Sequence, residues 1–279
     1  GELSLGHAGF MSVGAFSGVV ASVALQDLIP LGPARLFVCM LIGAVFAGIA
    51  GIIVGVPVLR LRGDYLAIVT LAFGEIIKNI INCLYIGVDG NGLHFSVTSE
   101  MALNLAEGGT AVIKGPMGAT GYAKLATFTA GFLLVIVSLV VVLNLIHSRA
   151  GRAIMALRDN RIAAESVGIG ATKYKLMAFV TSAVLAGAAG ALYAMNYGSI
   201  AAKKFDFNTS ILVLVFVVLG GMGNIRGSII AAAVLTVLPE MLRAVGEYRM
   251  LIYAVVLILV MIATNNATIR QFFAEKLHG

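Results

Sequence analysis

Long apolar runs, each close to the length that crosses a bilayer, dominate this chain of 279 residues. A membrane-spanning helix needs about 20 mainly apolar residues, because each residue adds about 1.5 Å toward a hydrocarbon core of about 30 Å. Backbone groups inside lipid must bond within their own segment, so such runs favour helices. The chain is only 11% charged, against about 25% in soluble domains. The predicted fold class is therefore all-α, a polytopic transmembrane helical bundle.

Seven of these runs are candidate spans, and we treat 1–279 as a single transmembrane domain. The span 65–86 is weaker than the others because it contains two charged residues, Glu75 and Lys78. The run 211–219 is too short to cross alone and leads into the glycines of 220–224. The chain opens at Gly1 inside what reads as a membrane segment, so we expect further residues before it. The predicted spans are 10–29, 36–56, 65–86, 124–146, 176–197, 229–245 and 250–263.

A polar, basic segment interrupts this pattern at 147–175. It carries six Lys/Arg against two acidic residues, and basic residues collect on the cytoplasmic side of membrane proteins. Asp159 and Asn160 are good helix starts, and Gly168 and Gly170 are good helix stops, so we expect two short helices. A structured cytoplasmic loop of this kind indicates docking of a soluble partner.

The same positive-inside bias sets the rest of the topology. Alternation from the cytoplasmic loop places 87–123 and 198–210 on the outer side and Arg226 and the C-terminus inside, which counts the segment 211–224 as one more crossing. The net charge of +6 follows from this bias, so no nucleic-acid partner is predicted.

No chemistry is visible in the sequence. Cys39 and Cys83 lie in apolar runs and are expected to be small buried hydrophobes, without a second Cys or a His at metal spacing. The sequence has no phosphate-binding Gly-x-x-x-x-Gly-Lys-Ser/Thr loop, no nucleophile elbow and no His-Glu-x-x-His. We therefore predict that the chain is not an enzyme and binds no metal or cofactor itself.

Small residues repeat at i, i+4 in three of the spans, which lines them on one side of each helix. This pattern predicts close helix packing, with lining of a transport pathway as the alternative. The three sets are Gly14/Gly18, Gly43/Ala47/Gly51 and Ala183/Gly187/Ala191.

Two places break the apolar pattern. Glu75 and Lys78 stand one helical turn apart in mid-span, where each charge should face protein or water. They either neutralise each other or line a pathway. The glycines of 220–224 cannot hold a stable helix, which predicts either a cytoplasmic turn between tilted spans or a re-entrant break near a pathway.

Five strings stand out along the chain: LSLGHAGF (3–10), LRLRGDYLAIVTLAFGEI (59–76), GRAIMALRDN (151–160), AGAAGALY (186–193) and LGGMGN (219–224). They resemble the permease subunits of branched-chain amino-acid ABC importers, and the second of them resembles the M-type (LivM-like) subunit. The resemblance covers nearly the whole chain, and we expect the family's first transmembrane helices to be absent from it.

The resemblance implies a multi-pass permease of a prokaryotic cytoplasmic (inner) membrane that carries leucine, isoleucine and valine. It implies a heterodimer with a sister permease subunit, two cytoplasmic ATPase subunits that hold ATP and Mg, and an extracytoplasmic substrate-binding protein. The alternatives are import of urea or short amides by the same architecture, an ion-coupled secondary transporter, and a non-transporting membrane scaffold.

The loop around 152–168 is, by the same resemblance, the element that couples to the ATPase. We expect Arg158, Asp159 and Glu165 to pair with the partner, and Ile154, Leu157 and Ile162 to insert as apolar anchors. The predicted coupling residues are Arg152, Ile154, Leu157, Arg158, Asp159, Asn160, Ile162, Ala164, Glu165 and Gly168. The pathway candidates are His7, Glu75, Lys78, Gly220, Gly221, Gly223 and Asn224.

Overall fold

The computed structural model describes residues 4–61, 64–90, 92–106, 108–221 and 223–242, with 254, 255 and 258. The chain divides into two compact units, Gly1–Ser210 and Ile211–Gly279. Most of the predicted span 250–263, and the end of the span 229–245, lie outside the described residues.

Five described helices are long and apolar enough to cross a membrane. They correspond to the first five predicted spans, with ends shifted by a few residues. The bundle is helical, as the apolar runs predict. These helices are α1 (His7–Ala24), α2 (Gly32–Val58), α3 (Asp64–Cys83), α4 (Phe128–His147) and α7 (Ala171–Met195).

Helices α1, α2 and α7 pack closely through their small residues. A Cβ added at Gly18 would lie 2.8 Å from Cβ of Ala191, and one added at Gly51 would lie 2.8 Å from Cβ of Ala183. Real Cβ atoms do not approach this closely, so the backbones meet only because side chains are absent. The prediction that these faces pack the bundle is confirmed.

Helix α4 does not pack closely as α1, α2 and α7 do. None of the residues of Phe128–His147 is buried against the rest of the chain, although the helix is rich in Leu, Val and Ile. Its apolar side chains, such as Phe132, 60% exposed, require lipid or another protein as their surroundings.

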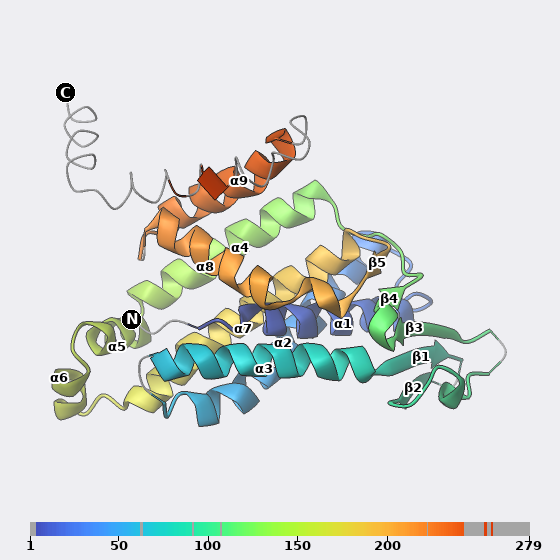
Figure 1. Ribbon diagram of the computed structural model, residues 1–279, viewed down its shortest axis with the longest axis horizontal. Helices are drawn as coiled ribbons and strands as arrows, with labels where there is room; N and C mark the ends of the chain where they lie inside the picture. Colours follow the sequence, from blue (N-terminus) through green and yellow to red (C-terminus); the bar gives the residue numbers. More distant parts are fainter. Residues whose placement is uncertain are drawn as a thin grey trace. The chain divides into compact units, whose positions relative to one another are not determined.

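A small antiparallel sheet, which the sequence analysis did not predict, occupies one end of the bundle (Figure 1). The predicted outer segments 87–123 and 198–210 both contribute strands, so they lie at the same end, as alternation requires. The strand order is β2-β1-β3-β4-β5. The strands are β1 (Tyr85–Asp89), β2 (Gly92–Ser96), β3 (Thr110–Lys114), β4 (Ala119–Thr120) and β5 (Ser199–Ile200), with 3₁₀ turns at Met101–Leu103, Gly115–Met117 and Ala202–Lys204.

A buried tyrosine fastens the segment after β4 to the bundle. Tyr122 is 6% exposed, and its hydroxyl donates a 3.0 Å hydrogen bond to the carbonyl of Ala194 in α7. Burial raises the pKa of Tyr122 to about 12, so the phenol stays protonated and keeps donating at any physiological pH.

The second unit contains a tight helical turn. Helix α8 (Phe207–Gly220) leads into α9 (Ile225–Met241) through Gly221 and Gly223, both with φ near +90°. Only glycine adopts that conformation easily. The side chain of Asn224 caps α9 by accepting from the N–H of Gly227 at 3.2 Å. The break predicted at 220–224 is therefore a turn between two helices.

Candidate functional site

The basic segment folds into two short helices, α5 (Arg149–Asp159) and α6 (Arg161–Ser166), which we call the hairpin. Asn160 starts α6, because its side chain accepts from the N–H of Ala163 at 3.1 Å. Gly168, with φ of +86°, follows α6. These two predictions are confirmed. Asp159 instead ends α5, and Gly170 precedes α7 rather than ending a helix.

The hairpin has its own small core. Leu157 and Ala164 are 7% and 4% exposed and pack with Ala171 at the start of α7. Leu157 therefore cannot insert into a partner, and that part of the anchor prediction is wrong. It holds the hairpin against α7 instead, while Ile154 is partly buried beside it.

Two apolar side chains do project from the hairpin. Ile162 is 79% exposed and Val167 is 76% exposed. Ile162 was predicted as an anchor, whereas Val167 was missed because it follows the helix rather than lying within it. An apolar pair this exposed is a feature that a protein partner would cover.

The hairpin charges already have partners within the chain. Arg158 Nη2 lies 2.9 Å from Asp159 Oδ1, and Arg161 Nε lies 2.8 Å from Glu165 Oε1. The expectation that these carboxylates have few local partners is wrong. Exposed pairs of this kind contribute about 0–1 kcal/mol, so exchange for a charge on another protein would cost little.

Arg152 belongs to the base of the hairpin. Its Nη1 donates a 3.2 Å hydrogen bond to the carbonyl of His147, at the end of α4. This contact fixes how α5 leaves α4. Its predicted coupling role stays a prediction.

Glu75 and Lys78 form the ion pair that their spacing predicts. Glu75 also accepts a 3.0 Å hydrogen bond from the N–H of Phe207 at the start of α8. The pair therefore ties α3 to that helix start, and its pathway role is still a prediction. The glycines Gly220, Gly221 and Gly223 and Asn224 form the turn described above.

Asp206 caps the start of α8. Its Oδ1 accepts from the N–H of Thr209 at 3.0 Å and from the Thr209 hydroxyl at 3.1 Å. Burial raises the pKa of Asp206, but these bonds, the amide of Asn208 and the positive charge of Lys78 together hold it below its ordinary value. The carboxylate is thus ionised throughout the neutral range.

The two cysteines differ. Cys39 is fully buried, as predicted, but Cys83 is exposed, so the prediction is wrong for Cys83. It stands at the end of α3, where the described chain does not cover it. No group of three potential metal ligands occurs among the described residues.

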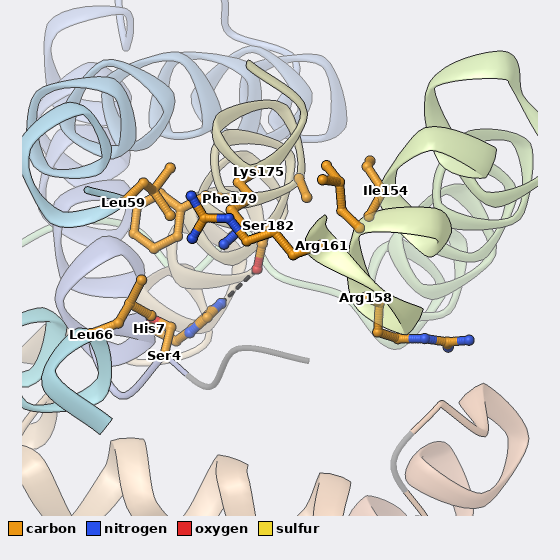
Figure 2. A pocket seen from close by; sticks show the side chains of 12 residues that line it. Ser4, His7, Leu59, Leu66, Ile154, Arg158, Arg161, Lys175, Phe179 and Ser182 are labelled. Atoms are coloured by element: carbon orange, nitrogen blue, oxygen red, sulfur yellow. Dashed lines mark hydrogen bonds between the residues drawn. The ribbon is translucent and has the colours of Figure 1, made fainter. Parts of the chain in front are cut away.

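A cavity of about 480 Å³ lies between the hairpin and helices α1, α3 and α7, and it reaches Ser182 at the middle of α7 (Figure 2). Arg161 and Lys175 line it, as does His7, whose Nε2 is 2.5 Å from the Ser182 hydroxyl. Of these three residues, only His7 was predicted from the sequence as a site residue. Arg161 and Lys175 are 14 positions apart and line the same cavity because the hairpin folds back.

Comparison with known proteins places the chain in a family. The family model described as branched-chain amino acid transport system / permease component matches residues 1–261. The high-affinity branched-chain amino acid transport system permease protein LivM of Salmonella typhimurium is 37% identical over 273 residues, 94% of this chain and 62% of LivM. LivM of Escherichia coli gives the same values.

A second type of permease is also similar. LivH of Salmonella typhimurium is 30% identical over 132 residues, 47% of this chain and 42% of LivH. No solved structure matches. The chain thus spans about 62% of the length of the LivM relatives. With its five apolar helices, it is a multi-pass helical membrane protein that belongs to the family of branched-chain amino acid transport system permease components.

Proposed function

We propose that this chain is a permease subunit of an ATP-driven importer for branched-chain amino acids in a prokaryotic inner membrane. The observation that carries the proposal is the hairpin, where Ile162 and Val167 are exposed at the end of the bundle opposite the sheet (Figure 1). Its similarity to LivM supports the substrate class.

The energy would come from partner subunits. The sequence contains no phosphate-binding loop of its own, so ATP and Mg belong to two cytoplasmic ATPases that bind the hairpin. The similarity to LivH, named as a permease of the same kind of system, supports pairing with a sister permease. An extracytoplasmic binding protein would deliver the substrate at the sheet end.

The contacts of the hairpin supply a route for coupling. When ATP brings the ATPases together, the hairpin moves with them. Because Leu157 and Ala164 pack on Ala171, the movement passes directly to α7. Helix α7 in turn packs along α1 and α2 at glycines where the neighbouring backbones are too close to admit a Cβ atom. The three helices would therefore shift together, and the pathway would open to the other side of the membrane.

A matched pair of variants tests the hairpin's role. Val167→Ser removes an apolar side chain that is 76% exposed at the hairpin, and Val97→Ser removes one that is 71% exposed at the sheet end. Burying a valine contributes about 1.5 kcal/mol or more. We expect Val167→Ser to weaken ATPase association about tenfold and to reduce ATP-dependent leucine uptake in proteoliposomes.

The control should leave ATPase association unchanged. Equal effects of the two variants, or no effect of either, would remove the hairpin from the coupling mechanism. Leucine uptake by this chain alone, driven by an ion gradient, would refute the importer proposal itself and favour the ion-coupled alternative. Uptake of urea or short amides instead of leucine would overturn only the substrate class.

A further inference from the structure

The cavity beneath the hairpin reaches far into the bundle (Figure 2). Ile154 and Leu157 of α5 line it on the hairpin side, and Ser182 lines it at the inner end. Helix α7 spans Ala171–Met195, so Ser182 lies near its middle, roughly 16 Å along the axis from its first residue. Since the hydrocarbon core of a bilayer is about 30 Å thick, the cavity extends to the middle of the membrane.

Helix α1 begins at the same depth. Its first residue is His7, whose side chain reaches Ser182 (Figure 2). The backbone of residues 4–6 is not helical, and the N–H of Leu5 donates a 3.0 Å hydrogen bond to Thr70 Oγ1 in α3. Non-helical backbone at membrane depth is stable only against protein or a water-filled cavity. Many transporters place their substrate site at this depth, beside helices that begin or end there, so the inner end of the cavity has the surroundings of a transport pathway.

The lining matches an aliphatic amino acid. Leu59, Leu66 and Phe179 form an apolar wall, against which a branched aliphatic side chain can pack. The hydroxyl of Ser182 and the imidazole of His7 can exchange their mutual hydrogen bond for bonds to the polar head of the ligand. The volume of about 480 Å³ falls within the range of about 300–1,000 Å³ that is usual for small-molecule sites.

The charged groups of the cavity are already engaged within the chain. Arg158 and Arg161 are paired with Asp159 and Glu165, and Lys175 also has an interaction within the chain. None of the described residues that line the cavity is acidic. The carboxylate and ammonium groups of an amino acid would therefore be held only by hydrogen bonds. A conduction pathway requires such weak binding, because the solute must leave as readily as it enters.

We propose that this cavity is the cytoplasmic half of the translocation pathway, through which a free branched-chain amino acid leaves the permease, and that His7 and Ser182 form its inner end. The hairpin side is the cytoplasmic side because its basic residues favour that placement. This assignment rests on the proposed function, which names the substrate but no residue of the pathway. Because the hairpin borders the exit, its movement would also widen or narrow the route.

Thiol labelling in inverted membrane vesicles, which expose the cytoplasmic face, tests the route. Ser182→Cys and Thr181→Cys are introduced separately into the assembled transporter in a Cys39→Ser/Cys83→Ser background, so that this chain carries one thiol. Thr181 is the matched control, because it lies at the same depth of α7 but does not line the cavity. The reagent is a membrane-impermeant, positively charged methanethiosulfonate.

We expect Ser182→Cys to react at least about tenfold faster than Thr181→Cys, because a charged reagent reaches a thiol at this depth only through water. Leucine added in excess on the cytoplasmic side should slow the labelling of Ser182→Cys. Equal labelling of the two thiols, or no labelling of Ser182→Cys, would overturn the route.

Uptake measurements separate a pathway from a closed, water-filled pocket. Ser182→Leu narrows the inner end, and we expect ATP-dependent leucine uptake to fall about tenfold, while Thr181→Leu keeps it. Both variants should still associate with the ATPases, which excludes misfolding as the cause. Full uptake by Ser182→Leu despite rapid labelling of Ser182→Cys would show a dead-end pocket and overturn the assignment. Failure of the proposed function would be visible separately, as absence of ATP-dependent leucine uptake by the unmodified transporter.

Discussion

Replacing Gly14 with alanine tests whether the close approach of α1 and α7 holds the bundle together. A Cβ at this position would overlap the backbone of Gly187. Because the obstacle is main chain rather than a flexible side chain, the two helices must separate to admit the methyl group. Gly131 in α4 provides the matched control, since a Cβ there would lie 3.8 Å from the nearest heavy atom, Leu192 Cδ2.

The magnitude follows from two opposing contributions. Both substitutions gain about 1 kcal/mol of helix propensity. Gly14→Ala alone incurs the overpacking cost of about 1–3 kcal/mol. The difference in the free energy of unfolding between the two variants is therefore about 1–3 kcal/mol in favour of Gly131→Ala, or roughly 2–10 °C in Tm.

The chain offers its own reporter for the measurement. It contains no tryptophan and two cysteines, of which Cys39 is 0% exposed. In a Cys83→Ser background, a thiol-reactive dye labels Cys39 only when α2 separates from its neighbours. Thermal labelling curves in detergent then give the midpoint of each variant. A midpoint for Gly14→Ala at or above that of Gly131→Ala would refute the packing argument.

Three further predictions concern stability and coupling. Asp206→Ala removes the cap of α8 and should cost about 0.5–2 kcal/mol at pH 7. Since the folded pKa of Asp206 is lowered, this difference should shrink as the pH falls below about 4 and through the folded pKa, as thermal midpoints across pH would show. Glu75→Gln leaves Lys78 without its ion-pair partner and should destabilise the chain by up to about 3 kcal/mol, whereas Glu75→Gln combined with Lys78→Met should recover most of the loss; a double-mutant cycle that shows simple additivity would contradict this. Leu157→Ala should lower stability by about 2 kcal/mol while Ile162→Ala does not, so circular dichroism melts that show equal effects would contradict the assigned burial.

The helices and the hairpin could be predicted because their signals are local. An apolar run of 20 residues and a capping Asn160 act within a few turns of the chain. The ion pair of Arg161 and Glu165 could also have been predicted, since i, i+4 spacing favours it. Glu165 was instead predicted to pair with a group on a partner protein.

The remaining features depend on contacts between distant segments. Strands β4 and β5 have two residues each, too few for any alternation, and form because Ala119 and Ile200 pair across the fold. The burial of Leu157 depends on Ala171, and the cavity is lined by residues as far apart in the chain as His7 and Ser182. No local pattern encodes these meetings.

The sheet anchors the C-terminal end of α7. Strand β5 begins four residues after α7 ends at Met195, and it pairs with β4. The hairpin packs against Ala171 at the opposite end of the helix. With 25 residues, α7 is a rigid arm about 37 Å long. A swing of roughly 5° about the sheet would carry its hairpin end about 3 Å. Small domain movements in a partner would thus be converted into displacement at one membrane face while the other face stays still.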